Sequence, residues 1–289
     1  MDKTALDQEL QDKINRVVEI LKKTVNGECA LALAGALAKG VADKSSDIDI
    51  FLFTDHPKSF EERERILREA ADPGTSPWIS ATLDYPWGGS MDFSYEGTPV
   101  EVVVRTFQLM DKRLKECLNG QFEIIPQTWT SNGYYTFTYL SELSFIKPIW
   151  DPKGLLQRYQ DYIKPYPSKL KASIMDCFFD RANTWINNFH YQSAIKRLDI
   201  LFTGPIVLHT VLDMIQVIFA INEEYFPGDK KLEAALTKLS YCPQELLDNM
   251  EVLLCASRNQ DQLQTQCDIL RRVMKDIEAK MELCREGSI

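Results

Sequence analysis

The chain has 289 residues, of which 45% are hydrophobic and 26% charged, and its formal net charge is −9. This length allows one large or two ordinary domains, and the composition is typical of a globular protein. The negative charge argues against a nucleic acid partner, because a polynucleotide binder needs a basic surface to displace counterions. Seven scattered cysteines without a CxxC spacing argue against a disulfide framework or a cysteine metal site.

Hydrophobic periodicity predicts a mixed first half and a helical second half. Apolar residues recur every three to four positions in the predicted helices and every second position in the predicted strands. The elements of the first half are, in chain order, a helix 3–24, strands 29–34 and 47–53, a helix from Ser59, a loop 72–90, strands 91–95 and 99–106, and a helix 107–118.

After about residue 150 the strand patterns stop, and helical patterns alternate with breaks such as the one expected at Gly204–Pro205. The most apolar stretch, 198–221, contains polar residues and is expected to be a buried helix, not a membrane span. A seam of apolar residues near the end predicts a helix docked on its own bundle or, alternatively, a dimer-forming helix. Its members are Leu263, Cys267, Leu270, Met274, Ile277, Met281 and Cys284.

Asp47 and Asp49 are the most informative residues of the chain. Side chains in a strand alternate between its faces, so both carboxylates project together while Ile48 and Ile50 point into a core. Two neighbouring carboxylates repel each other unless a hard cation such as Mg²⁺ lies between them. The glycine-containing turn 35–40 just upstream supplies backbone N–H groups that bind phosphate. Together these features predict nucleotide chemistry.

Glu101 is a third candidate carboxylate and the only acid in a β-branched strand. Its neighbours Val100, Val102 and Val104 occupy one face of this strand, which places Glu101 on the other. Burying an unpaired Glu in a sheet costs several kcal/mol, so a metal-containing or water-filled site explains this residue better than a core does.

The apolar strand 30–34, the turn Gly35-Ala36 and the motif Asp47-Ile48-Asp49 resemble the signature of the DNA polymerase β-like nucleotidyltransferase superfamily. The signature includes a third carboxylate on a later strand, and Glu101 fits it. The chain is most similar to the bacterial aminoglycoside and lincosamide nucleotidyltransferases, and residues 222–231 extend this similarity. Ala36 departs from the usual Ser or Gly, which would remove a hydroxyl contact to the triphosphate.

The resemblance implies an α+β fold with two domains. Residues 1–150 would form the nucleotidyltransferase domain, a mixed sheet flanked by helices. Residues 151–289 would form an all-α helical-bundle domain that contributes to the substrate cleft. The implied reaction is Mg²⁺-dependent transfer of a nucleoside monophosphate, AMP from ATP, to a hydroxyl of a small molecule. An aminoglycoside or lincosamide antibiotic is the favoured acceptor, which implies a role in antibiotic resistance.

The resemblance also implies roles for ten residues. Asp47, Asp49 and Glu101 are the expected catalytic residues and metal ligands of a site for one or two Mg²⁺ ions. Glu101 either completes the second metal site or accepts the proton of the attacking hydroxyl. ATP or another nucleoside triphosphate would contact a further set, consisting of Gly35, Ala36, Lys39, Ser46, Tyr225, Lys230 and Lys231.

Several alternatives stay open at this point. One alternative is an AMPylating enzyme, whose acceptor is a hydroxyl of a protein. Another is a catalytically silent nucleotide-binding module, which Ala36 favours. Lys230 and Lys231 are equally well explained as cations at a helix C-terminus. Three aromatic residues of the loop 72–90, Trp78, Tyr85 and Trp87, either stack on a substrate ring or form a small core. We expect a cytoplasmic monomer or homodimer without a nucleic acid or membrane partner.

Overall fold

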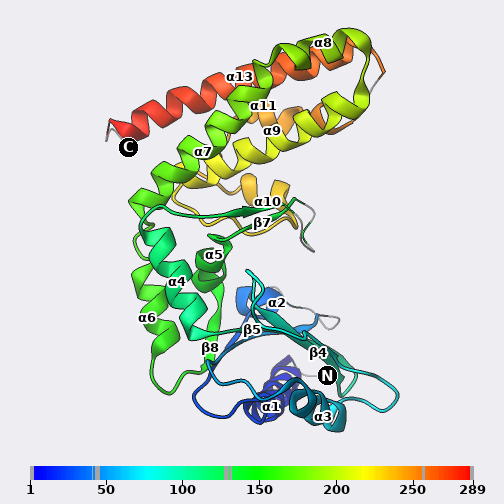
Figure 1. The fold of residues 1–289 in the computed structure, drawn as a ribbon, viewed down its shortest axis with the longest axis vertical. Coiled ribbons are helices and arrows are strands. Elements are labelled where there is room, and N and C mark those ends of the chain that lie inside the picture. Colours follow the sequence, from blue (N-terminus) through cyan, green and yellow to red (C-terminus); the bar gives the residue numbers. More distant parts are fainter. Residues whose placement is uncertain are drawn as a thin grey trace. The chain divides into compact units, whose positions relative to one another are not determined.

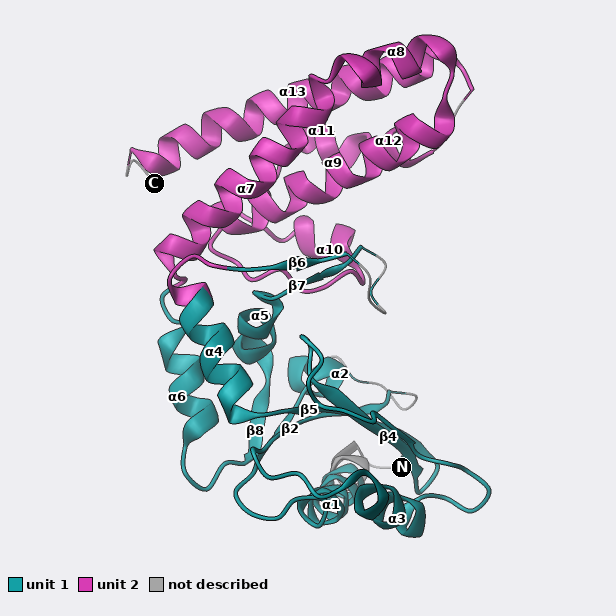
Figure 2. Cartoon of the chain, viewed as in Figure 1, with its two compact units in different colours: residues 1–116, 122–165 teal, residues 117–121, 166–289 magenta. Residues whose placement is uncertain are grey.

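A computed structural model describes residues 3–40, 42, 46–126, 130, 132–255 and 258–286. The chain divides into two compact units, residues 1–116 with 122–165 and residues 117–121 with 166–289 (Figure 2). Helix α6, Leu155–Tyr162, lies in the first unit. The domain boundary at residue 150 stays a prediction.

Unit 1 is built on a six-stranded sheet with the order β3-β4-β5-β2-β1-β8. The pair β2–β5 is parallel and the other pairs are antiparallel, so the predicted mixed sheet is confirmed. Its strands are β1 Ala30–Leu33, β2 Ile48–Phe53, β3 Trp78–Ile79, β4 Gly89–Tyr95, β5 Thr98–Arg105 and β8 Lys147–Trp150. A small separate hairpin is formed by β6 Ile124–Ile125 and β7 Tyr134–Tyr135.

Two helices cover one face of this sheet (Figure 1). Residues of α1 and α3 form a core with the inward-pointing residues of β2, β4 and β5. This core includes Ile48, Ile50, Val100, Val102 and Val104, as their alternation predicted. The helices of unit 1 are α1 Lys3–Lys22, α2 Gly35–Lys39, α3 Phe60–Ala70, α4 Phe107–Leu118, which extends into unit 2, α5 Thr138–Phe145 and α6.

Short edge strands account for most differences from the expected elements. The segment predicted as a loop contains β3, and β8 was not predicted. A strand of two residues is too short to show a period of 2. Strand β8 includes Pro148, which is tolerated here because β8 lies at the edge of the sheet.

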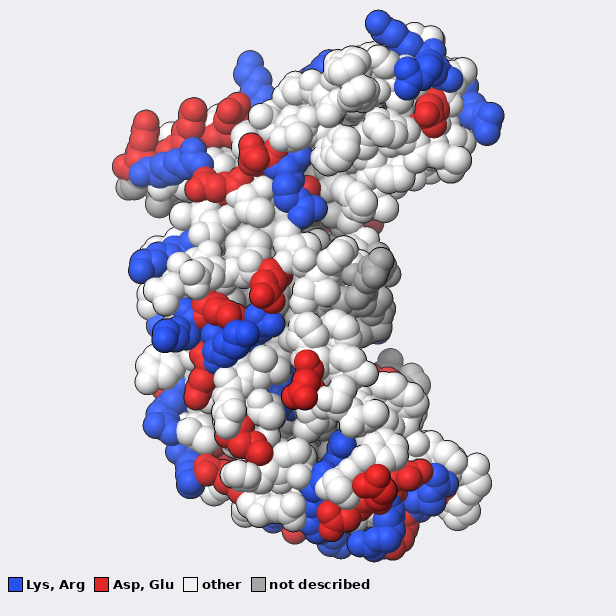
Figure 3. All heavy atoms as spheres, in the orientation of Figure 1, with Lys and Arg blue, Asp and Glu red and all other residues white. Residues whose placement is uncertain are grey.

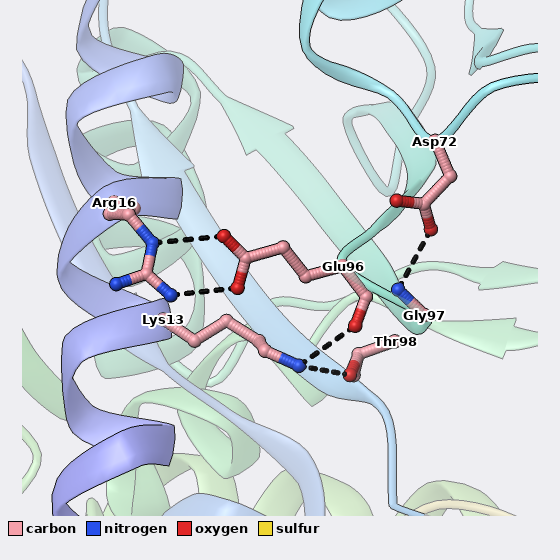
Figure 4. A network of polar contacts seen from close by, with 6 residues as sticks. All are labelled: Lys13, Arg16, Asp72, Glu96, Gly97 and Thr98. Atoms are coloured by element: carbon pink, nitrogen blue, oxygen red, sulfur yellow. Dashed lines mark hydrogen bonds and ion pairs between the residues drawn. The ribbon is translucent and has the colours of Figure 1, made fainter.

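Helix α1 holds the turn of the β4–β5 hairpin (Figure 4). Glu96 and Gly97 form this turn with positive φ angles of 49° and 72°. Arg16 donates from Nε and Nη2 to the two carboxylate oxygens of Glu96, at 3.1 and 2.7 Å, which lowers the pKa of Glu96. Lys13 donates to the Glu96 carbonyl at 3.0 Å, and Asp72 accepts from the Gly97 N–H at 2.9 Å. Together these contacts fix the start of β5.

Unit 2 is helical, as expected. Its central helix, α9, runs through Gly204 and Pro205, so the break predicted there is wrong. Pro205 lies in the second turn of α9, where it removes one backbone hydrogen bond without ending the helix. The seven helices described in this unit are α7 Ser168–Ile186, α8 Phe189–Arg197, α9 Ile200–Ile221, α10 Leu232–Leu236, α11 Gln244–Asp248, α12 Met250–Leu254 and α13 Gln260–Arg285.

Two apolar patterns in unit 2 are buried within the chain itself. The helix α9 has the length and hydropathy of a membrane span, with a mean hydropathy of 1.8, but 78% of that window is buried inside the chain. The predicted buried helix is thus confirmed. In α13, all seam residues except Cys284 are buried, which shows a helix packed on its own bundle.

Asp213 is a buried carboxylate in the apolar helix α9. It is 2% exposed and accepts a hydrogen bond from Arg181 Nε at 3.2 Å. Burial raises the pKa of Asp213 to about 6, and Arg181 opposes this only in part because its own side chain is 41% exposed.

We expect Asp213→Asn to change the pH dependence of stability. The unfolded chain has an Asp pKa of about 3.9, so the folded protein binds more protons between that pH and about 6. The wild type therefore loses stability as the pH rises through this window, by about 3 kcal/mol at most. Urea denaturation at both ends of the window measures this loss, which should be absent in the variant. An equal loss in the variant would contradict this assignment.

Candidate functional site

Asp49 and Glu101 are direct partners in the parallel pair of β2 and β5. Adjacent strands lie about 4.8 Å apart, so the two backbone positions are immediate neighbours. Both residues alternate with core residues, which places their side chains on the face of the sheet opposite to α1 and α3. Asp49 is half-buried and Glu101 is exposed. The structure therefore brings two of the three predicted acids to adjacent positions.

The third acid, Asp47, lies immediately before β2 and is half-buried. Among the described residues, no three His, Cys, Asp or Glu side chains lie close enough together to hold a metal ion. The set of three metal ligands, Asp47, Asp49 and Glu101, therefore stays a prediction.

Gly35 packs directly against the carboxylate of Asp49. A Cβ atom at position 35 would lie 1.7 Å from Asp49 Oδ2, and the φ angle of Gly35 is +53°. The positive φ angle favours glycine, and the lack of space for a Cβ atom requires it. The Ala34 N–H donates to the Asp49 carbonyl at 2.9 Å and fixes the approach of this segment to β2. The expected glycine turn is thus a short helix, α2, whose first residue contacts the acid.

The other predicted nucleotide-binding residues of unit 1 lie around α2. Ala36 is in the first turn, where backbone N–H groups have no intrahelical partner. Lys39 is exposed at the end of α2, with Nζ 4.3 Å from the ring centre of Phe145. Ser46 is half-buried, next to Asp47.

Tyr225, Lys230 and Lys231 lie in unit 2, between α9 and α10. The ring of Tyr225 is half-buried and stacks on Tyr166, with the centroids 4.7 Å apart, and burial raises its pKa. Both lysines are exposed. They precede α10, so their interpretation as cations at a helix C-terminus is wrong. A role of these three residues in nucleotide binding stays a prediction.

The buried cation Arg105 is the last residue of β5, on the face of the sheet that carries Glu101. Arg105 follows Glu101 by four residues on the same face of β5 and forms an ion pair with Glu142. Its guanidinium lies 3.8 Å from the ring centre of Tyr139, and its Nε donates to the Trp87 carbonyl at 3.2 Å. Burial alone would lower the pKa of Arg105, but Glu142 and the tyrosines raise it, so the residue stays charged. Along β5, the Cα atoms of Glu101 and Arg105 are about 13 Å apart.

Asp92 in β4 is a further acid of this face that was not predicted from the sequence. It alternates with the core residues Met91 and Phe93, so it lies on the same face as Glu101. Its carboxylate accepts from Ser90 Oγ at 3.0 Å and from the Val102 N–H at 3.1 Å. Burial raises the pKa of Asp92, and these hydrogen bonds offset the shift in part. The alternation of apolar residues in 91–95 was the signal that could have identified it.

Comparison with known proteins agrees with this geometry. Residues 14–73 match a family model described as a nucleotidyltransferase domain. Residues 138–232 match a family described as a domain of unknown function, DUF4037. The first match includes the segment with Gly35, Asp47 and Asp49. It shows a nucleotidyltransferase domain, and the protein is of the nucleotidyltransferase class.

Solved structures add only distant similarities. A nucleotidyltransferase-like protein from Exiguobacterium sibiricum 255-15 is 9% identical, with a TM-score of 0.47 over 92% of this chain and 74% of its own. A CCA-adding enzyme in complex with ATP is 13% identical, with a TM-score of 0.24 over 99% of this chain and 74% of its own. With these TM-scores, neither similarity indicates the function of this chain. No curated protein matches the chain.

We expect Gly35→Ala to destabilise the protein more than Gly40→Ala. Both glycines have positive φ angles, but a Cβ at position 40 would meet no atom within 4 Å. Backbone strain alone predicts a loss of about 1 kcal/mol for Gly40→Ala. The additional collision with Asp49 predicts about 2–4 kcal/mol for Gly35→Ala. Urea denaturation measures both losses, and equal losses would show that the Asp49 carboxylate does not occupy the space beside Gly35.

Proposed function

We propose that this protein transfers a nucleoside monophosphate, AMP from ATP, to a hydroxyl of a small molecule and releases pyrophosphate. The observation that carries the proposal is the pairing of Asp49 with Glu101 on adjacent parallel strands, with Gly35 packed against Asp49. The nucleotidyltransferase domain match over residues 14–73 supports it.

The donor set fits a magnesium ion that is shared with the nucleotide. Mg²⁺ prefers oxygen ligands and is usually held by one or two protein carboxylates together with substrate phosphates. Asp47 and Asp49 would supply these carboxylates, and Glu101 would be a further ligand or the general base. When bound, the ion neutralises negative charge that develops on the transferred phosphoryl group. Two carboxylates plus phosphate oxygens suffice for such a site.

The positions of the residues suggest how the substrates are oriented. In phosphoryl transfer the attacking and leaving oxygens lie roughly in line on opposite sides of the phosphorus. The backbone N–H groups of Gly35 and Ala36, with Lys39 and Ser46 nearby, would bind the leaving phosphates. The attacking hydroxyl then lies on the Glu101 side of Asp49. A bond forms between this oxygen and the α-phosphorus, the bond to the bridging oxygen breaks, and Glu101 would accept the hydroxyl proton.

We also propose nucleotide-binding roles for three residues of unit 2. Tyr225 offers an aromatic ring for the base, with one face already packed on Tyr166. Lys230 and Lys231 are exposed cations suited to phosphate. These assignments rest on the resemblance in residues 222–231.

A small hydroxylated acceptor, of the aminoglycoside or lincosamide type, is favoured over a polynucleotide. On the face drawn in Figure 3, Lys and Arg side chains are interspersed with Asp and Glu over unit 1. Polynucleotide binding depends on a concentrated basic surface, and the net charge is −9. A cationic antibiotic would instead be attracted to this protein.

We expect wild-type protein to release pyrophosphate from ATP in the presence of Mg²⁺ and an acceptor from a panel of hydroxylated antibiotics. Asp49→Asn should reduce the rate of pyrophosphate release by about 100-fold or more. The variant would hold Mg²⁺ less well, so the negative charge that develops on the transferred phosphoryl group would be less stabilised. Asp12→Asn is the matched control, since Asp12 is an exposed residue of α1. Chelation of Mg²⁺ by EDTA should abolish release, and added Mg²⁺ should restore it.

Two other outcomes would contradict the proposal. Calorimetry that shows binding of Mg-ATP, together with no pyrophosphate release for any acceptor, would identify a silent nucleotide-binding module. Label transferred from α-labelled ATP to a co-purified protein would identify an AMPylating enzyme.

A further inference from the structure

Trp78 presents an exposed indole on the face of the sheet that carries Asp49 and Glu101. It lies in the edge strand β3, directly opposite Asp92 of β4, and opposite residues of an antiparallel pair share a face. The next residue, Ile79, packs on the core, so Trp78 points to the opposite side. The side chain of Trp78 is 61% exposed.

The neighbouring aromatic residues Tyr85 and Trp87 are packed on other rings. Their rings stack on each other at 5.3 Å, and Trp87 meets the edge of Tyr134 at 6.0 Å. These contacts favour the core interpretation for Trp87, which is half-buried, whereas Tyr85 is 39% exposed and stacks on Trp87 from outside. Within the part of the chain that the structure describes, Trp78 makes no ring–ring or cation–π contact. A single exposed aromatic residue is common in proteins, so its position is what distinguishes Trp78.

Trp78 continues a row of site residues across four strands. The row starts at Asp49 and Glu101, which are paired. The pairs Ser90–Val103 and Phe93–Val100 place Asp92 opposite Glu101 on the next strand. Trp78 follows opposite Asp92. At about 4.8 Å per strand, the Cα atom of Trp78 is about 10 Å from that of Glu101 and about 14 Å from that of Asp49.

The proposed reaction determines which end of this row faces the leaving group and which end faces the acceptor. The leaving pyrophosphate would lie at Gly35 and the α-phosphate at Asp49, so the attacking hydroxyl approaches from the side of Glu101. The body of the acceptor molecule then extends past Asp92 toward β3. We propose that Trp78 packs against a ring of the acceptor and thereby determines which acceptors are used. This inference rests on the proposed function.

The surface between Glu101 and Trp78 fits a ring that carries hydroxyl groups and a positive charge. The face of an indole attracts a cation within about 6 Å of its centre, and it also packs on the C–H face of a saturated ring. The carboxylates of Glu101 and Asp92 lie between the indole and the reacting hydroxyl and favour a cationic group there. An amino sugar combines all of these properties.

The test uses kanamycin as a defined amino-sugar probe. Calorimetry measures its binding to the full-length protein with Mg²⁺ and α,β-methylene-ATP, which cannot be cleaved at the α-phosphate. We expect Trp78→Ala to weaken kanamycin binding about 10-fold or more, and Trp78→Phe to restore part of the affinity. Trp150→Ala is the matched control, because Trp150 is 38% exposed on β8 at the opposite edge of the same sheet. The affinity for the ATP analogue should be the same in all four proteins.

The outcomes separate this inference from the proposed function. Wild-type protein that does not bind kanamycin, or Trp78→Ala protein that binds it as the wild type does, would overturn the inference. Pyrophosphate release is measured separately with ATP in place of the analogue. Kanamycin binding that depends on Trp78, without release, would support the acceptor site and contradict the transfer reaction. Release with an acceptor KM that Trp78→Ala does not change would overturn the acceptor site and support the transfer reaction.

Discussion

The site depends on the parallel pairing of β2 with β5, which places Asp49 beside Glu101. Like charges at directly neighbouring sheet positions repel each other, so this pairing is unfavourable by itself. The apolar residues on the other face of the same strands hold it in place, through their core with α1 and α3. The contacts of α1 with the Glu96 turn fix the start of β5. Packing on one face therefore holds the two carboxylates at adjacent positions on the other, which is the arrangement that a cation site requires.

Much of unit 1 followed from periodicity, but its register did not. The period of 2 predicted that Asp49 and Glu101 would each point away from the core. The period of 2 does not tell which residue of β2 pairs with which residue of β5. In a parallel pair, the packing of the long connection between the strands sets the register. The contact of Gly35 with Asp49 could not be predicted either, because the positive φ angle and the nearby carboxylate both depend on the tertiary structure.

Residues outside the motif were the hardest to predict. Asp92 was overlooked because its strand was interpreted only as half of a hairpin, and Trp78 lay in a segment too short for a strand pattern. In unit 2 the apolar pattern of α9 predicted its burial, yet Pro205 suggested a break that the packed helix tolerates. Pro205 is exposed while its neighbours Ile206 and Val207 are buried, so the helix loses one backbone hydrogen bond on its exposed side and keeps its packing.

The most direct test is a crystal structure with Mn²⁺ in place of Mg²⁺ and α,β-methylene-ATP, in which anomalous scattering locates the ion. We expect an ion bound by oxygens of Asp47 and Asp49 and of the α-phosphate, with the carboxylate of Glu101 on the same side of the sheet and the leaving phosphates against Gly35. An ion bound elsewhere, or a triphosphate on the Trp78 side of Glu101, would contradict it.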